Sequence, residues 1–590
     1  MFTTVNLKLP LPAALSSDVP TGREIRSCEA LEAWLKTASP ASEGVDLEPP
    51  KAALKRLFGL FKAWSAPHDF HMFVSGSYRL GVYTKDADID VVFVTTSAIK
   101  RAAVFRNFVD VLFETEGVTD IQSVPQARVP IISMRIDGQE FDVLTCHLGT
   151  KALPTRTALL QSYDWMNNVD EASVLAFSAT RVTEVLIHSV PRWQQYTTAL
   201  RFLRLWAKRR CIYSNKAGYL GGVNVALLTA FVARLYPNAT ASTLVAKFFE
   251  MFAEWRWGGG NPVRMHDMAD CPVWLTACEW TMHVGEAMVV LTPCYPQTNS
   301  MFSASTTTCV VMHREFQRGA HLLVSKDGRY GAEDPKTWQT VCAPLAALAT
   351  CTRFLRVTVS APNTTQGRSW QGYMESQTRH LVQYLSKQEL AVREFRYLPV
   401  WVTRPAVTVT ATATQPESST DVKHGRADTV FRETYICAED DGKIRTYVVR
   451  GRTDVPLEYF MRMHAENGPV RPRGTNVKLD FIENPDVLPA AFVEYDRDTL
   501  LGFTAEEPVI PPSEVSCEAA TTACAGSSTG TPKPVIEHMM FYGGMPAAAP
   551  PAATRERKRL RIVEPLRTTA DGGPFMFKRK TWPFAAHTPV

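Results

Sequence analysis

The 590-residue sequence has few of the features that mark membrane, secreted or zinc-binding proteins. None of its twelve cysteines forms a C-x-x-C pair, which argues against a zinc site and for reduced, intracellular thiols without dense disulfide bonding. The longest apolar stretch, residues 219–236, contains Asn224 and Arg234 and is not expected to span a membrane. The chain opens without a charged-then-apolar leader, so we expect no secretory signal.

Charge and low-complexity sequence are also scarce over most of the chain. The net charge is +5, and residues 551–590 alone hold nine basic and three acidic side chains, so the preceding residues are close to neutral. The net charge of the folded part therefore does not indicate that it binds nucleic acid. Glycine (32) and proline (39) are at average usage, and the apolar share of 45% is that of a globular chain of several domains.

Local patterns predict helices and strands in a mixed order. Apolar residues at helical spacing predict helices, which we place at 53–64, from an N-cap at Ser97 to Glu114, over most of 172–251, and at 370–385. A short helix around Leu31 to Leu35 would start from Ser16-Ser17-Asp18. Runs rich in β-branched residues predict strands at 89–94, 354–360 and 395–402, and hairpins at 129–146 around Asp137-Gly138 and at 429–450 around Asp441-Gly442.

Three aspartates carry the strongest chemical signal. Asp88 and Asp90 point the same way on a strand, whereas Ile89, Val91 and Phe93 face the core. Two adjacent carboxylates repel each other unless cations lie between them, and Mg²⁺ prefers carboxylate and phosphate oxygens.

Asp142, on a hairpin strand, would complete a set able to hold two metals if its strand neighbours the first. Asp86 lies outside this triad, and Gly76-Ser77 offers a tight turn with free N–H groups suited to phosphates. A D-x-D pair alone is common at strand ends. Its combination with a third aspartate is similar to the arrangement in polymerase-β-like nucleotidyltransferases.

Two blocks of sequence carry a more specific resemblance. The run from Gly76-Ser77 through Thr84 to Asp88-Ile-Asp90 closely resembles the eukaryotic nuclear poly(A) polymerases. A second block resembles them equally, with Arg204-Leu-Trp-Ala-Lys-Arg-Arg followed by Tyr213-Ser-Asn215 and Gly221-Gly222-Val223. The similarity is dense over about residues 70–320 and thinner over 350–500.

The resemblance implies a set of nucleotide-contacting residues. Arg204 stands where the family places an ATP-contacting lysine, and Ser75 where it usually has an aromatic residue. Asp88, Asp90 and Asp142 would be the catalytic residues and the ligands of two Mg²⁺ or Mn²⁺ ions. The complete expected ATP-binding set is Ser75, Gly76, Ser77, Thr84, Asp88, Asp90, Asp142, Arg204, Tyr213, Asn215, Gly222 and Val223.

The resemblance also implies an α+β fold of several parts. We expect a mixed-sheet nucleotidyltransferase palm, a helical central domain, an RRM-like α/β C-terminal domain and a disordered basic tail. The expected boundaries are 1–48 for an N-terminal arm and helices on the central domain, 49–150 for the palm, 151–347 for the central domain, 348–502 for the RNA-binding domain and 503–590 for the tail. No aromatic RNP motif is present, so base stacking on that sheet is not supported.

By resemblance, the expected function is template-independent adenylyl transfer from ATP to RNA 3′ ends with release of pyrophosphate. Expected partners are ATP, an RNA 3′ end and RNA-processing factors, with no membrane and with a monomeric chain. A terminal uridylyltransferase and an RNA-binding pseudoenzyme are the alternatives. The basic tail segments 555–561 and 578–580 are either a nuclear import signal, which fits the expected nuclear location, or an RNA contact.

Overall fold

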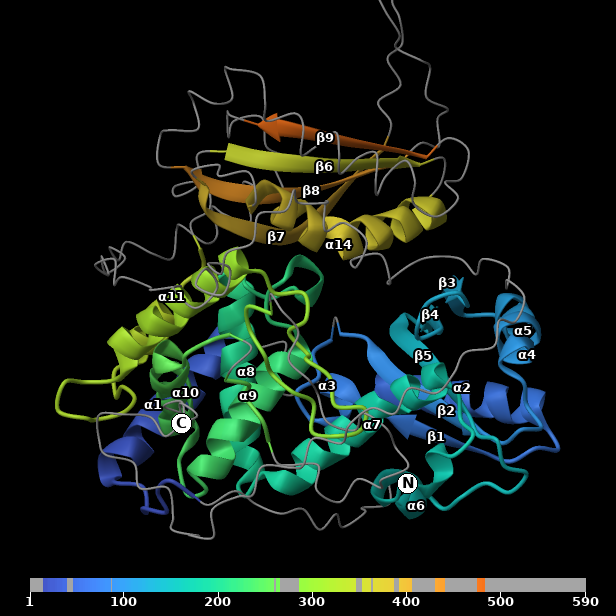
Figure 1. Ribbon diagram of the computed structural model, residues 1–590, viewed down its shortest axis with the longest axis horizontal. Coiled ribbons are helices and arrows are strands. Elements are labelled where there is room, and N and C mark those ends of the chain that lie inside the picture. The colour runs from blue at the N-terminus through green and yellow to red at the C-terminus, as the bar shows by residue number, and fades with distance from the viewer. Residues whose placement is uncertain are drawn as a thin grey trace, which may run out of the picture. The chain divides into compact units, whose positions relative to one another are not determined.

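The computed structural model describes residues 14–39, 46–85, 87–258, 261–265, 286–345, 353–361, 364–386, 392–405, 430–440 and 475–482. Within these ranges two sheets and a set of helices are formed (Figure 1). The expected tail at 503–590 and the turn Asp441-Gly442 lie outside the described residues, as does Asp86. The described helices include none that is both long and apolar enough to cross a bilayer.

The first sheet has five strands in the order β1-β2-β5-β4-β3. Its strands are β1 (Phe70–Val74), β2 (Ile89–Thr95), β3 (Val118–Val124), β4 (Ile131–Ile136) and β5 (Gln139–His147). The β4–β5 hairpin turns at Asp137 and Gly138, whose φ values of 51° and 83° are those of the predicted type I′ turn. β2 and β5 run parallel while the other pairs are antiparallel, which makes the sheet mixed, as predicted.

Each face of this sheet packs on a separate core. Val91 and Phe93 of β2 face a core that also holds side chains of α2 (Glu48–Ser65), the π-helical turn Val104–Phe108 and α5 (Val109–Glu114). Val92 and Val94 face a second core with α6 (Arg156–Gln161), the 3₁₀ turn Asp164–Met166 and α7 (Glu171–Ser189). The side chain at position 90 belongs to this second face, since alternate strand residues share a side.

Most of the remaining described helices surround one large core. They are α1 (Gly22–Ala38), α8 (Trp193–Arg209), α9 (Gly222–Leu235), α10 (Ala241–Glu254), α11 (Thr306–Leu323) and α12 (Pro335–Val341). Trp206, Tyr196 and Phe248 are fully buried at its centre. α9 explains the apolar stretch found in the sequence, because every residue from Asn224 to Leu235 is buried. The predicted run of helices over 172–251 is therefore confirmed.

Two predicted helix starts are wrong. The helix expected from Ser97 begins only at α4 (Arg101–Ala103). Residues 97–99 form a turn before it, in which the Ile99 N–H donates to the Thr96 carbonyl. α1 begins after Thr21, not at Ser16-Ser17-Asp18. Thr21 and Glu24 form a capping box there, whereas the Ser16 hydroxyl bonds locally to Asp18.

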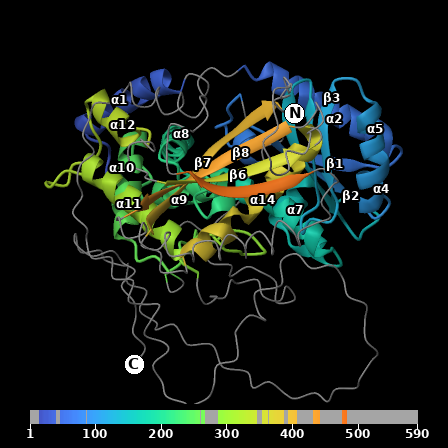
Figure 2. The same cartoon turned by 90° about the horizontal axis from the view of Figure 1, so that it is seen from above.

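The second sheet has four antiparallel strands in the order β7-β8-β6-β9. Its elements are β6 (Arg353–Ala361), α14 (Thr364–Ser386), β7 (Val392–Pro405), β8 (Val430–Asp440) and β9 (Asn476–Ile482), and β6, β7 and β8 lie side by side in Figure 2. The strands predicted at 354–360 and 395–402 and the helix at 370–385 are confirmed. Residues 441–474 lie outside the described residues, so the RRM-like interpretation stays a prediction.

Candidate active site

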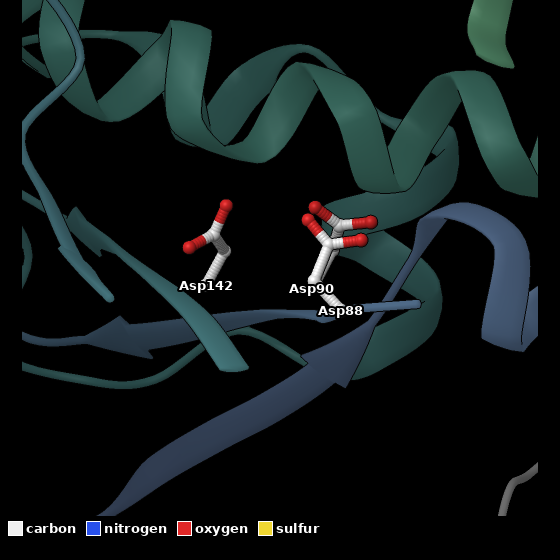
Figure 3. Close-up of side chains that lie close together, drawn as sticks. All are labelled: Asp88, Asp90 and Asp142. Carbon is white, nitrogen blue, oxygen red and sulfur yellow. The ribbon is translucent and has the colours of Figure 1, made fainter. Parts of the chain in front are cut away.

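The three aspartates lie together at the start of β2 and in the neighbouring strand β5 (Figure 3). Parallel pairing of β2 with β5 places Asp90 directly opposite Asp142, and Asp88 comes two residues before Asp90. One carboxylate oxygen from each of the three lies within 4.8 Å of the others. The expectation that the hairpin strand neighbours the first strand is confirmed. This pairing brings Asp142 to residues that precede it by 52 and 54 positions.

Burial and crowding make the cluster electrostatically unfavourable without a cation. Asp90 is half-buried, and burial, together with Asp88 and Asp142, raises its pKa from 3.8 to about 7. Burial also raises the pKa of Asp142. The Ser133 hydroxyl, which donates to Asp142 Oδ1 at 2.6 Å, opposes this rise because it stabilises the ionised carboxylate. Crowded carboxylates of this kind are the donor set that hard divalent cations prefer, so the residues present fit Mg²⁺ or Mn²⁺.

The glycine of the predicted turn is required by Asp90. Gly76 has φ of 62°, and a Cβ atom on it would lie 1.9 Å from Asp90 Oδ2. Only glycine tolerates both the backbone conformation and the contact. The Gly76 N–H is not free, contrary to expectation, because it donates to the Thr183 hydroxyl at 3.3 Å.

Ser75 and Ser77 flank this glycine in different environments. Ser75 is 1% exposed, and its N–H donates to the Asp90 carbonyl at 3.0 Å. Its hydroxyl has no hydrogen-bond partner among the residues that the structure describes. Ser77 is half-buried in the short helix α3 (Gly76–Arg79), and its carbonyl accepts from Val82 N–H. Ser75 therefore packs behind the turn and Ser77 lies nearer its surface.

Arg204 is tied to the chain that follows α3. Its Nη1 donates to the Val82 carbonyl at 2.6 Å, and neighbouring Arg201 donates to the Gly81 carbonyl at 2.8 Å. Thr84, half-buried on the same segment, accepts the Ala87 N–H through its carbonyl. Part of the Arg204 guanidinium is thus engaged by protein backbone.

The remaining predicted residues form a second group around the start of α9. The hydroxyl of Tyr213 would lie 3.1 Å from any Cβ at position 222, so Gly222 leaves room for it. Lys208 lies with its ammonium 5.5 Å from the centre of the Tyr213 ring. Val223 is 41% exposed. Gly222 is also exposed, whereas Tyr213 and Asn215 are half-buried.

The sequence interpretation missed the residues that hold this second group in place. Fully buried Asn224 accepts the Gly221 N–H at 2.6 Å and the Asn215 amide at 3.1 Å, and donates to the Ser300 hydroxyl at 2.8 Å. Asn215 also donates to the Ser300 carbonyl at 3.0 Å. The only local signal was an asparagine at the third helical position after Gly221, where a side chain can cap the helix. Nothing local indicates Ser300.

Two parts of the chain match known protein domains. Residues 65–190 match the poly(A) polymerase nucleotidyltransferase domain, and residues 195–339 match the poly(A) polymerase central domain. Nuclear poly(A) polymerase 1 of Arabidopsis thaliana is 34% identical over 316 residues, which are 52% of this chain and 43% of that protein. The poly(A) polymerase of Dictyostelium discoideum is 33% identical over 316 residues, 53% of this chain and 38% of that protein.

The match spans less than half the length of these curated relatives. Among solved structures, the Cid1 poly(U) polymerase bound to its short product ApU has a TM-score of 0.37 and 14% identity, over 52% of this chain and 98% of that one. That likeness is too slight to carry an argument. Residues 65–190 and 195–339 of the chain are therefore similar to the nucleotidyltransferase and central domains of poly(A) polymerases.

Proposed function

We propose that the protein is a template-independent polynucleotide adenylyltransferase that adds AMP from ATP to RNA 3′ ends and releases pyrophosphate. The observation that carries the proposal is the cluster of Asp88, Asp90 and Asp142, which lies beside the Gly76 turn in the matched nucleotidyltransferase domain. The curated relatives are named poly(A) polymerases, which supports adenylate as the transferred nucleotide.

In this reaction the RNA 3′ oxygen forms a bond to the α-phosphorus of ATP while the bond from that phosphorus to the bridging oxygen breaks. Asp88, Asp90 and Asp142 would hold two Mg²⁺ or Mn²⁺ ions. Bound there, the ions supply positive charge that eases loss of the hydroxyl proton and stabilises the leaving pyrophosphate. Gly76 keeps the space around the Asp90 carboxylate open, and Ser133 orients Asp142.

The other predicted residues are proposed to bind ATP. Ser75, Gly76, Ser77 and Thr84 lie on the segment next to Asp90, where the triphosphate would be bound. Arg204 reaches that segment from α8, and its positive charge suits the phosphates. Tyr213, Asn215, Gly222 and Val223 form the second group, which is proposed to contact the nucleoside.

Uridylyl transfer is the alternative within the same chemistry, and a pseudoenzyme is the alternative outside it. The sequences Tyr213-Ser-Asn215 and Gly222-Val223-Asn224-Val, and the names of the curated relatives, favour adenylation. The presence of all three carboxylates within 4.8 Å favours an enzyme. We further propose a nuclear location, since two of the similar relatives are named nuclear, and RNA-processing factors as partners of a monomeric chain.

The test is extension of a short labelled RNA with each of the four nucleoside triphosphates separately, in Mg²⁺ or Mn²⁺. We expect efficient extension with ATP alone, a loss of at least 100-fold for Asp90→Asn, and little change for Asp110→Asn, an exposed carboxylate on α5. Preferential use of UTP would replace the proposal by the uridylyltransferase. Activity of Asp90→Asn near that of the parent protein would remove the triad from the mechanism.

A further inference from the structure

Helix α3 is a single turn whose two ends are both attached to α7. At its first residue, the Gly76 N–H donates to the Thr183 hydroxyl at 3.3 Å. At its last residue, Arg79 donates two hydrogen bonds to the Glu184 carboxylate, from Nε at 2.7 Å and from Nη2 at 3.1 Å. A turn of four residues cannot hold its own conformation in water, so these contacts fix where it lies.

The chain that follows α3 is attached in the same manner. The carbonyls of Gly81 and Val82 accept from Arg201 and Arg204 of α8. The segment from Gly76 to Val82 is therefore held by side chains of α7 and α8 as well as by the Ser75 N–H bond to the Asp90 carbonyl.

The position of this turn sets the space available to the Asp90 carboxylate. The Cα atom of Gly76 lies so close that a Cβ on it would meet Asp90 Oδ2 at 1.9 Å. A shift of the turn by a fraction of an ångström would crowd or release this carboxylate. Ligands of a metal site must be held within about 0.5 Å of their working positions.

The ion pair itself is a poor source of net stability. The side chains of Glu184 and Arg79 are 7% and 24% exposed, so both charges have lost most of their hydration. The cost of desolvating such a pair roughly cancels its electrostatic attraction, so an apolar pair of equal volume would be about as stable. The ion pair differs in its two directional hydrogen bonds, which an apolar pair cannot make.

We propose that the Arg79–Glu184 ion pair is a positioning device, which holds the Gly76 turn against Asp90 and so orders the three carboxylates for their metals. This inference rests on the proposed function and adds two residues that act through the turn. Neither the family resemblance nor the local sequence pattern indicated Glu184, because it follows 105 residues after its partner on another element.

A matched control pair exists on the same helix. Arg128, in the loop before β4, donates to Glu171 at the start of α7, at 2.6 Å, and its two side chains are 54% and 70% exposed. This pair also connects the five-stranded sheet region to α7. Its side chains are far more exposed than those of Glu184 and Arg79, so its loss shows what removal of a connecting surface ion pair does.

The experiment compares the full chain with Arg79→Lys, Glu184→Gln, the double variant Arg79→Met with Glu184→Met, and Arg128→Met with Glu171→Met. For Glu184→Gln we expect a 10- to 100-fold lower kcat, less than a threefold change in KM for ATP and RNA, and a smaller rise in Tm on addition of Mg²⁺. Arg79→Lys keeps the positive charge but replaces the two-bond contact by one bond. Its kcat should therefore lie between those of the parent and Glu184→Gln.

The apolar double variant separates positioning from stability. We expect it to fold with a Tm near that of the parent, because buried ion pairs are replaced by apolar pairs at little cost. Its kcat and its Mg²⁺-induced rise in Tm should nevertheless be lower than those of the parent. The control variant, Arg128→Met with Glu171→Met, should have parental values of both. Parental kcat and parental Mg²⁺ response in the double variant would overturn the inference. If the parent transfers no nucleotide, the proposed function fails, and the Mg²⁺ response still decides the positioning role.

Discussion

Replacement of Asp90 by asparagine should make the metal-free protein more stable at neutral pH. Burial and the nearby Asp88 and Asp142 raise the pKa of Asp90 to about 7. Above that pH the folded protein must hold an ionised carboxylate beside two others, a cost that the unfolded chain does not bear. An asparagine of the same shape carries no charge and removes the cost.

The magnitude follows from the same values. A carboxyl that holds its proton to about pH 7 in the folded protein, but only to 3.8 when unfolded, binds more protons in the folded state between these limits. Stability therefore falls as pH rises through this window, and the full deficit is present above pH 7. Three pH units correspond to about 4 kcal/mol. Asp90 is half-buried and the cluster can relax, so we expect about 1–3 kcal/mol.

The assay is thermal unfolding of the parent protein and of Asp90→Asn at pH 5 and pH 8, with EDTA or with Mg²⁺. In EDTA at pH 8 the variant should melt higher, by about 2–4 °C per kcal/mol for a unit of this size, and the difference should shrink at pH 5. Mg²⁺ should raise the Tm of the parent and hardly that of the variant. Asp110→Asn, on the exposed side of α5, should behave as the parent in all four conditions. A variant that melts lower than the parent in EDTA at pH 8 would refute the reasoning.

Three further predictions test neighbouring parts of the chain. Gly76→Ala should lower kcat at least 100-fold, because a methyl group meets Asp90 Oδ2, and should destabilise by about 1–2 kcal/mol through its left-handed backbone; parental kinetics would contradict the geometry. Arg204→Ala should raise KM for ATP or lower kcat by a total of ~2–4 kcal/mol, with Arg204→Lys restoring most of it; a lower Tm with unaltered ATP kinetics would make Arg204 purely structural. Deletion of residues 551–590 should move the protein to the cytoplasm and spare extension of a short RNA, whereas an unchanged distribution together with weaker RNA binding would favour an RNA contact.

The sequence predicted those features whose cause is local or periodic. The alternation around Asp88 and Asp90 predicted that Val91 and Phe93 face a core, but not that the Asp90 side of β2 packs on a second core. Asp137-Gly138 predicted the hairpin that carries Asp142. The sequence also predicted β6, β7, β8 and α14 of the second region, but not β9. Helix starts were less predictable. Ser97 has the chemistry of an N-cap, but the residues that follow it form a turn and the helix starts only at Arg101.

The supports of the candidate site could not be predicted because they act between distant segments. Thr183 and Glu184 form hydrogen bonds with a turn that precedes them by about a hundred residues. Ser300 forms hydrogen bonds with Asn215 and Asn224 from another loop. In the sequence these are an ordinary threonine, glutamate and serine, with no spacing that distinguishes them from surface residues. Thr183 and Glu184 gain a role only because α7 packs against α3, and Ser300 gains one only because its loop contacts the start of α9.

Arg204 shows how such a contact changes the reasoning about a residue that the sequence did identify. Resemblance placed its charge at the phosphates of ATP, whereas the structure uses Nη1 to hold the Val82 carbonyl on the segment that continues from the Gly76 turn. The two roles are compatible, because a guanidinium has five donors and the Val82 bond occupies one. A lysine could satisfy the carbonyl or the phosphates with a single ammonium. It could not bridge both with the same rigid fork. If Arg204 does both, Arg204→Lys will restore ATP binding more fully than it restores the position of the turn, and its remaining deficit should then appear in kcat and not in KM.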